Sequence, residues 1–243
     1  MGIHLLAMGV ALALVLSDPL VAQERPWPPR GPALLGASGG IRTDRLSRKE
    51  LKTWEKVVAI VMAEGPDGKP LHPTLRALWD AVDMSGHAVY VEMRDPKARL
   101  SYLAGRFAIT SVDPEGKAHV GIIMLNLRII DKASTGRAAK RANGFIPFEG
   151  LGQKERYAEV LGHELAHAVW SLADTERARL AQRLQGEMER QMRMLLTARA
   201  QGLGAELQEH VGELDRLSRA LEEPVEAAEM VIWEELKAGQ RPR

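Results

Sequence analysis

The residues best suited to chemistry in this chain form the pattern His163-Glu164-x-x-His167. In a helix, side chains four positions apart project from neighbouring turns of one face, so both imidazoles can reach a single metal ion at about 2.0–2.1 Å. Glu164 lies one step around the helix from His163, where its carboxylate can accept a proton from a water beside the ion. The pattern predicts a metal site with His163 and His167 as ligands and Glu164 as the catalytic general base.

A structural histidine pair on an ordinary amphipathic helix is the alternative to a metal site. The apolar residues opposite His163 on a helical wheel are expected to face the core: Leu161, Leu165, Ala168 and Leu172. Apolar residues also share the histidine side, namely Val160, Ala166 and Trp170. A fully solvated face has no need of them, so this side is predicted to line a cleft, and the metal site is preferred.

The composition is that of an ordinary globular protein. The chain has 243 residues, 45% of them hydrophobic, and a net charge of +1 at pH 7, which indicates one domain or one domain with an appendage. Basic and acidic residues are mixed, so no nucleic-acid partner is expected, and the basic cluster over 137–141 is interpreted as a solvated loop. The absence of cysteine excludes disulfides, thiolate ligands and a cysteine nucleophile.

The N-terminus resembles a secretory signal peptide. The apolar run Leu5–Leu16 is followed by small residues and a cleavage site predicted after Ala22, which assigns residues 1–22 to the signal. The run is short for a membrane span, although few charges precede it and an uncleaved anchor stays open. We therefore expect a secreted or periplasmic protein with no stable membrane span after cleavage.

The remaining sequence predicts an α+β domain over 46–243, preceded by a linker over 23–45 that is rich in proline and glycine. Ser47 and Glu50 have the spacing of a capping box at the start of the first helix. The predicted elements are helices over 46–64 and 73–82, strands over 87–93, 105–112 and 118–130, and the motif helix over 153–172. The three strands are expected to form a small antiparallel sheet.

Two further segments have expected roles. Residues 131–152 form a long loop, in which 145–150 is expected either to wall the cleft or to plug the core beneath the loop. Residues 175–221 favour helix and are interrupted near Gly202 and Gly204, which predicts an inserted helical hairpin. This hairpin is expected to pack on the domain, to cap the cleft or to mediate dimerisation, and the oligomeric state is left open.

Taken together, the motif, a sheet before it and a glutamate-bearing helix after it resemble the gluzincin-type zinc metallopeptidases of the zincin class. The resemblance covers roughly 118–236 and is specific at the motif. Metzincins are excluded because Trp170 and Ala173 occupy the positions of their glycine and third histidine. The resemblance implies a zinc cofactor and a peptide or protein substrate laid along an edge strand. Residues 121–127 are the candidate edge, with an ordinary buried strand as the alternative, and Asn126 is the residue there that could touch a substrate backbone.

The resemblance also implies that a glutamate from a later helix completes the zinc site. On a wheel of the C-terminal helix, Glu226 and Glu229 lie within about 60° of each other beside apolar residues, whereas Glu223 and Glu234 point away. Glu226 is the expected third ligand. Glu229 is the runner-up, or an acceptor for a histidine N–H. A solvated acidic helix start, favoured by the helix dipole, is the alternative.

The expected function is an exported zinc-dependent metallopeptidase that hydrolyses peptide bonds. The alternative is a non-catalytic exported protein that binds zinc, or binds a partner through the helical hairpin. An oxyanion donor besides zinc would be needed, and the sequence does not select among Tyr157, His119 and His210.

Overall fold

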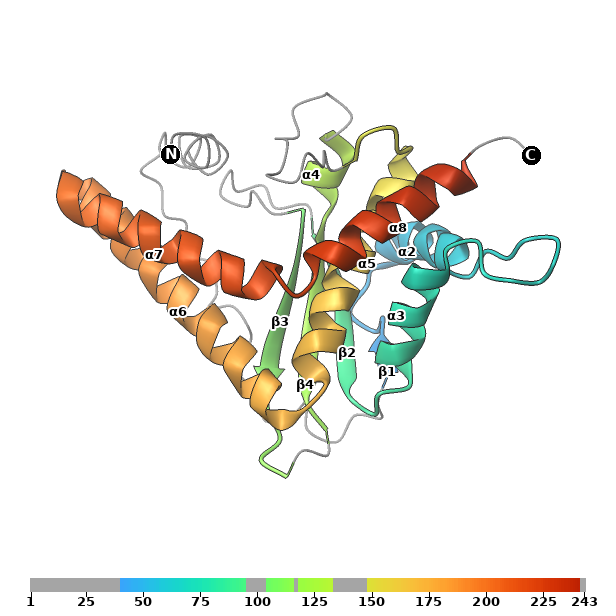
Figure 1. The fold of residues 1–243 in the computed structure, drawn as a ribbon, viewed down its shortest axis with the longest axis horizontal. Coiled ribbons are helices and arrows are strands. Elements are labelled where there is room, and N and C mark those ends of the chain that lie inside the picture. The colour runs from blue at the N-terminus through green and yellow to red at the C-terminus, as the bar shows by residue number, and fades with distance from the viewer. Residues whose placement is uncertain (1–39, 95–103, 116–117, 133–147, 241–243) are drawn as a thin grey trace.

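The computed structural model describes residues 40–94, 104–115, 118–132 and 148–240 (Figure 1). These residues form the α+β fold that the sequence predicts. The strands are β1 (Gly40–Arg42), β2 (Ala88–Arg94), β3 (Gly105–Ser111) and β4 (Val120–Asn126). The helices are α2 (Arg48–Val61), α3 (Pro73–Asp83), α4 (Leu127–Lys132), α5 (Gln153–Leu172), α6 (Thr175–Ala200), α7 (Gly204–Glu222) and α8 (Glu226–Gly239).

Some of the predicted segments fall outside the described residues. The signal peptide over 1–22 does so, as do most of the linker over 23–45 and residues 133–147 of the loop expected over 131–152. Among the helices that the structure describes, none combines the length with the apolar composition needed to cross a bilayer.

The first helix forms where its cap and its apolar spacing predict. The Ser47 side chain accepts a hydrogen bond from the backbone N–H of Glu50, and the Glu50 carboxylate accepts one from the N–H of Ser47 at 2.7 Å. This capping box satisfies N–H groups that a helix start leaves without partners. Trp54 and Val57 are buried on the face that packs into the core.

The sheet is mixed, so the prediction of an antiparallel sheet is wrong. Its strand order is β1-β2-β4-β3, with β1, β2 and β4 parallel and β3 antiparallel to β4. Alternation and apolar content locate a strand but do not fix its direction. The continuous burial of Val89, Tyr90 and Val91 in β2 is what a strand covered on both faces requires.

The prediction that residues 121–127 form an edge strand is also wrong. These residues belong to β4, which lies between β2 and β3, and β3 is the outer strand on this side of the sheet. The expected strand over 118–130 ends at Asn126, where α4 begins. The Asn126 side chain accepts a hydrogen bond from the N–H of Ile129 at 3.2 Å and so caps this short helix. Asn126 is buried and does not lie on an open edge.

One part of the expected linker belongs to the sheet. Residues Gly40–Arg42 pair with β2 as β1, so the folded domain begins before residue 46. Ile41 donates its N–H to the Asp83 carboxylate at 3.0 Å, which fixes the strand against the end of α3. Gly40 has a φ of 98°, and a Cβ there would lie 2.9 Å from the same carboxylate, so the entry needs glycine.

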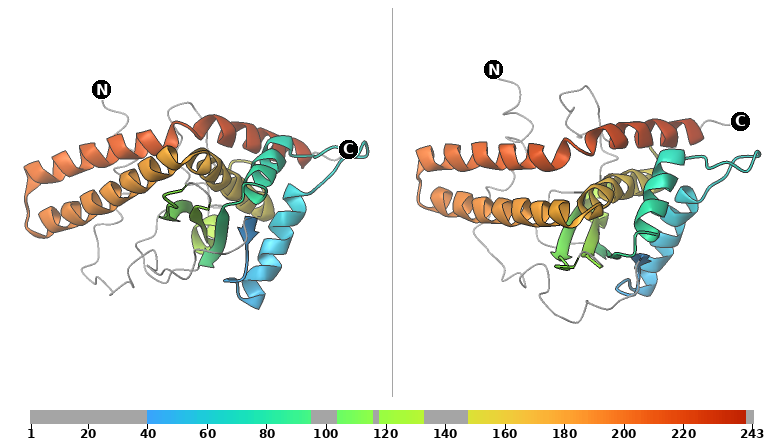
Figure 2. Two further views of the ribbon diagram at one scale, coloured as in Figure 1. Left: turned by 90° about the horizontal axis from the view of Figure 1, so that it is seen from below. Right: turned by 60° about the horizontal axis from the view of Figure 1, so that its bottom comes forward.

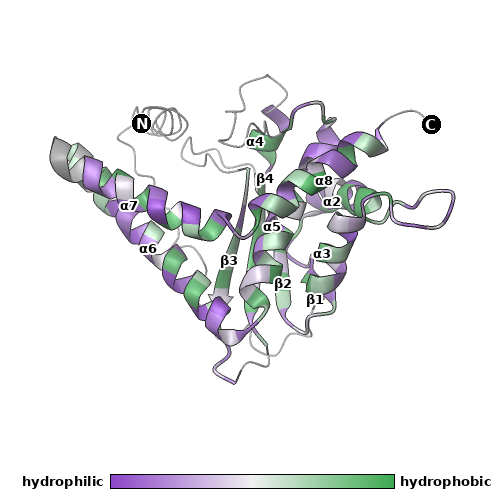
Figure 3. Cartoon of the chain, in the orientation of Figure 1, coloured by the Kyte–Doolittle hydropathy of each residue, from purple (hydrophilic) through white to green (hydrophobic). Residues whose placement is uncertain are grey.

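Helix α5 lies at the centre of the domain. Fourteen of its 20 residues are buried, with the sheet against one side and α3 and α8 against the other. Figure 2 shows the sheet, α5 and α8 as successive layers. Gly162 makes the close approach of α3 and α8 possible, because a Cβ there would meet Ile232 at 2.8 Å and Leu75 at 3.0 Å. Figure 3 shows the apolar colouring along β2, β3 and β4.

The predicted helical hairpin is present. Helices α6 and α7 pack side by side and project from the domain as an arm (Figures 1 and 2). Leu195, Leu214 and Leu217 are buried between them. The arm leads the chain away from α5 along α6 and returns it along α7, so the last residues of α7 lie beside α5 again.

Candidate metal centre

Two histidines of α5 point at each other. The Nε2 atoms of His163 and His167 lie 3.1 Å apart, and their rings meet edge to face with centroids 4.7 Å apart. Their side chains are 12% and 11% exposed. The i, i+4 spacing on one helix face produces this convergence.

Glu222, the last residue of α7, completes a cluster of three groups. Its Oε2 atom lies 3.3 Å from Nε2 of His163, and its Oε1 atom lies 3.6 Å from Nε2 of His167. Ligands held at about 2.0–2.1 Å around a tetrahedral ion lie about 3.3 Å from one another. The three separations therefore fit one zinc-sized ion with two nitrogen ligands and one carboxylate. Within the described residues these three side chains form a group able to hold a metal ion.

The expected third ligand Glu226 is not brought to the histidines. It lies on the exposed side of the first turn of α8, whereas Glu222 occupies the place that Glu226 was expected to take. The predicted hairpin ended at residue 221, and the wheel of the C-terminal helix did not weigh Glu222. In the structure α7 includes Glu222, and the break around Pro224 separates the directions of Glu222 and Glu226.

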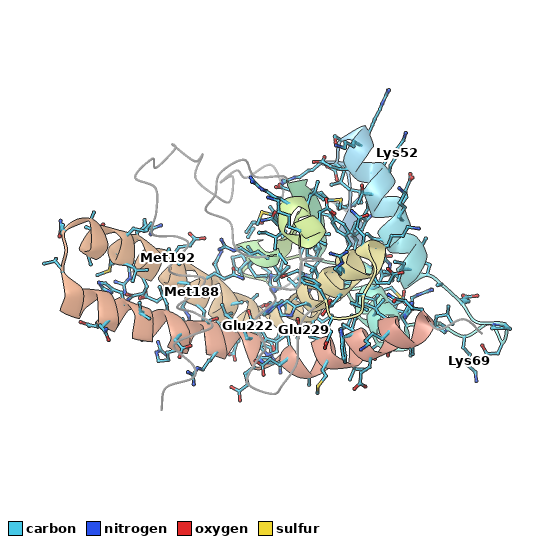
Figure 4. The ribbon with its side chains drawn as sticks, turned by 90° about the horizontal axis from the view of Figure 1, so that it is seen from above. Lys52, Lys69, Met188, Met192, Glu222 and Glu229 are labelled. Atoms are coloured by element: carbon cyan, nitrogen blue, oxygen red, sulfur yellow. The ribbon has the colours of Figure 1, made fainter. Side chains whose placement is uncertain are left out.

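Glu229 lies behind His163, on the side away from the cluster. Its Oε2 atom is 3.5 Å from Nδ1 of His163, and its side chain is 7% exposed. This distance exceeds that of a hydrogen bond, and Nδ1 is buried without a hydrogen-bond partner. Glu229 is thus the carboxylate that faces the Nδ1 side of His163, where an orienting acceptor for a histidine ligand would lie. Figure 4 shows Glu222 and Glu229 close together at the junction of α7 and α8, with Met188 and Met192 farther out on the arm.

A signal in the sequence could have pointed to Glu222. An acidic residue in the last turn of a helix lies at the negative end of the helix dipole, where it is unfavourable. Pro224 disfavours helix at the residue before it, which ends the preceding helix close to Glu222. A residue that violates a local rule without an evident gain often serves a functional site.

Glu164 lies beside the cluster, under the strand β3. Its side chain is buried, and a Cβ at Gly105 would lie 2.5 Å from its Oε1 atom, so β3 can cross the helix here because residue 105 is glycine. Burial raises the pKa of the Glu164 carboxyl. The nearby His163 and His167 and a hydrogen bond from the Phe107 backbone N–H oppose this rise.

The electrostatics of the site favour a positive charge between these residues. Burial alone would lower the pKa of His163, but Glu222, Glu229 and Glu164 around it raise this pKa well above its usual value. Burial alone would raise the pKa of Glu222, yet the imidazoles of His163 and His167 beside it hold this pKa far below its usual range. Three carboxylates around two imidazoles form a site for a cation, whether a proton or a metal ion.

The candidate oxyanion donors lie elsewhere. The Tyr157 hydroxyl donates to Asp131 at 2.9 Å. His119 stacks on His87 with ring centroids 4.8 Å apart, and His210 bonds Gln191 within the arm. Of the loop expected to wall the cleft, 145–147 lie outside the described residues, and the backbone N–H of Phe148 donates to Glu159 at 3.2 Å.

The fold and the site define a class of protein. It is an α+β domain in which the central helix and the returning arm bring two histidines and a carboxylate together beside a buried glutamate. The comparisons with protein families, curated proteins and solved structures found no match for the chain.

Proposed function

We propose that the chain is an exported zinc-dependent metallopeptidase with a zincin-like arrangement of sheet and motif helix. The observation that carries the proposal is the convergence of His163, His167 and Glu222, at 3.1 to 3.6 Å, directly beside the buried Glu164. Two nitrogens and one carboxylate are the ligand set of catalytic zinc sites that keep a fourth position open for water or substrate.

In this proposal each residue of the site has one task. His163, His167 and Glu222 hold the ion, and Glu229 orients the ring of His163. Bound zinc would polarise the scissile carbonyl and make a nearby water more acidic. Glu164 accepts the proton of that water and passes it to the leaving amine. Its raised pKa suits the first step, because a more basic carboxylate takes the proton more readily and holds it until the leaving nitrogen accepts it.

The strand nearest to Glu164 supplies the expected place for a peptide backbone. Gly105 lies against Glu164, and β3 is an outer strand of the sheet, which is the kind of edge to which an extended peptide adds. We therefore propose β3, in place of residues 121–127, as the strand that binds the substrate backbone, since β4 is paired on both sides.

A second function is favoured by the low exposure of the site. Side chains of His163 and His167 that are 12% and 11% exposed also suit a closed structural zinc site, in which no substrate reaches the ion. In that case the protein binds zinc without catalysis, and the ion fastens the arm to the domain through Glu222.

Replacement of the general base separates the two functions. The wild-type protein and Glu164→Gln are loaded with one equivalent of zinc, and hydrolysis of a mixed peptide library is followed by mass spectrometry. The peptidase predicts equal zinc content and a loss of turnover of at least about 100-fold in the variant. Zinc-loaded wild-type protein that leaves the whole library intact supports the structural site instead.

Export is a separate part of the proposal and rests on the pattern of residues 1–22. It predicts that the mature protein begins at Gln23 outside the cytoplasm. Mass measurement of the protein from each cell fraction tests this, and an intact N-terminus confined to the cytoplasm contradicts it.

A further inference from the structure

The outer edge of β3 is occupied by a side chain of the arm. Gln185 of α6 accepts a hydrogen bond from the backbone N–H of Ile109 at 3.1 Å and donates one to the carbonyl of Phe107 at 3.0 Å. Both groups point away from β4 and are therefore the groups to which an added strand would bond. One residue of the chain itself thus takes the place of a neighbouring strand.

The primary amide of glutamine resembles a peptide group, because its carbonyl acceptor and its N–H donors lie in one plane. It bonds the carbonyl of Phe107 and the N–H of Ile109 at once. One turn farther along α6, Glu189 forms an ion pair with Arg106 at 2.7 Å. Helix α6 is therefore fixed along the β3 edge at two successive turns, as the contact between these elements also shows.

The blocked part of the edge begins at the site and extends to one side of it. Glu164 lies against Gly105 and accepts a hydrogen bond from the backbone N–H of Phe107. The Phe107 carbonyl and the Ile109 N–H, which bond Gln185, lie farther along the strand. Antiparallel pairs of strands are two to three times as common as parallel ones. In an antiparallel addition, the part of the peptide beside residues 107–109 precedes the part beside Gly105, so it is the N-terminal side of the substrate.

We infer that Gln185 is a specificity-determining residue, which stops a bound peptide on the N-terminal side of the scissile bond. The inference rests on the proposed peptidase function and deepens it. The enzyme then acts on peptides with a short stretch before the cleaved bond, and peptides extended on that side must displace the Gln185 amide. Extension on the C-terminal side, beyond Gly105, leads away from the Gln185 amide.

The alternative role for Gln185 is to protect the sheet, since a helix that covers an edge strand prevents aggregation through that edge. The two roles differ in what they predict for substrates. Edge protection alone changes solubility and leaves the dependence of cleavage on peptide length untouched, whereas the specificity role changes that dependence.

The test uses Gln185→Ala and a matched control, Gln182→Ala, which removes an exposed glutamine one turn earlier on α6. Alanine favours helix, so both variants are expected to fold. Zinc-loaded proteins are given two peptide series around one cleavable bond, lengthened on the N-terminal or on the C-terminal side. Wild-type protein and Gln182→Ala should lose kcat/KM with each N-terminal extension. Gln185→Ala should cleave the extended peptides at least about tenfold faster, with short peptides cleaved as before, because two competing hydrogen bonds are gone.

Equal length dependence in Gln185→Ala and Gln182→Ala overturns the inference, and so does a restriction on the C-terminal side. A second readout separates this failure from failure of the peptidase itself. In proteins that also carry Glu164→Gln, an extended peptide should slow amide hydrogen exchange over residues 105–111 when Gln185 is replaced and not when Gln182 is. Protection without hydrolysis by the wild-type enzyme refutes the peptidase and retains Gln185 as the guard of a peptide-binding edge. If the extended peptide slows exchange over residues 105–111 in neither variant, the inference is refuted.

Discussion

The carboxylate of Glu222 lies 3.3 Å from Nε2 of His163, although the whole two-helix arm lies between these residues in the chain. The arm is what makes this contact, because α6 leads away from α5 and α7 returns to it. Closure of the site therefore depends on the arm being in place. The same arm covers the β3 edge through Gln185, so the three-residue cluster and the β3 edge both depend on one element.

Replacement of Glu222 is expected to weaken zinc binding strongly. Glu222→Gln removes a charged ligand and should raise the zinc Kd by more than about 100-fold, a larger loss than is usual for groups that only orient a ligand. The matched control is Glu226→Gln, which removes an exposed carboxylate just beyond the break between α7 and α8 and should change the Kd less than about twofold. Competition with a chromogenic chelator measures both. The reverse order of effects would return the third ligand to Glu226.

Replacement of Glu229 is expected to have an intermediate effect. Glu229→Gln removes the charge 3.5 Å from Nδ1 of His163 while keeping an acceptor, so the ring is still oriented but is a weaker ligand. The zinc Kd should rise by about 10-fold to 100-fold. Calorimetric titration with zinc provides the value. A loss as large as that of Glu222→Gln would mean that Glu229 binds the ion directly.

The contact between Gly105 and Glu164 predicts a substitution that impairs the site and the fold together. In Gly105→Ala the new Cβ would lie 2.5 Å from Glu164 Oε1 and 2.6 Å from Val160 Cγ1, so β3 or α5 must shift. Urea unfolding should show a loss of about 1–3 kcal/mol. Peptide hydrolysis should fall further than zinc binding.

The control for Gly105→Ala is Gly186→Ala on α6, where a new Cβ meets nothing within 4 Å. Alanine in a helix interior is favoured over glycine by about 0.5–1 kcal/mol, so this variant should gain stability and keep activity. If Gly105→Ala were as stable and as active as Gly186→Ala, the close crossing of β3 over Glu164 would be wrong.

The stacked pair His87 and His119 should make the fold sensitive to acid. Burial lowers the pKa of both imidazoles, and for His87 the neighbouring ring adds to this. Each Nδ1 accepts a backbone N–H: His119 from Asp113 at 3.2 Å, and His87 from His119 at 3.0 Å. Protonation of either Nδ1 would place its new N–H against the backbone N–H that it now accepts, and the hydrogen bond would be lost.

The sign of the effect follows from these lowered pKa values. Below about pH 6.5 these two histidines are protonated in the unfolded chain but stay neutral in the folded chain. Their contribution to the free energy of unfolding is therefore fully present above that pH and declines as the pH falls. Loss of the two acceptors should lower the unfolding free energy by about 1–2 kcal/mol between about pH 7.5 and about pH 5. Asparagine at residue 119 retains an acceptor without titrating, and His119→Asn should flatten the curve. An unchanged slope in urea unfolding would exclude this pair as its source.

Much of the fold could be predicted because its signals are local. The capping box at Ser47, the i, i+4 histidines and the glycine break between α6 and α7 are each contained in a short stretch of sequence. The α+β class, the motif helix and the helical hairpin are confirmed. The direction of β4 could not be predicted, because strand pairing is decided by long-range packing and not by alternation.

The residues that the sequence did not predict share one physical cause. Glu222 and Gln185 act through the path of the arm, which returns the chain to α5 and lays α6 along β3. No local pattern encodes where a helix returns. The wheel of the last helix could compare Glu226 with Glu229 but could not compare either with a residue beyond the break at Pro224.

Anomalous scattering at the zinc edge, from crystals of the zinc-loaded protein, tests the central claim most directly. The expected result is a single strong peak at about 2.0–2.1 Å from Nε2 of His163, Nε2 of His167 and the Glu222 carboxylate, with Glu164 beside it. A fully loaded protein whose zinc lies elsewhere, or whose third ligand is Glu226, would contradict it.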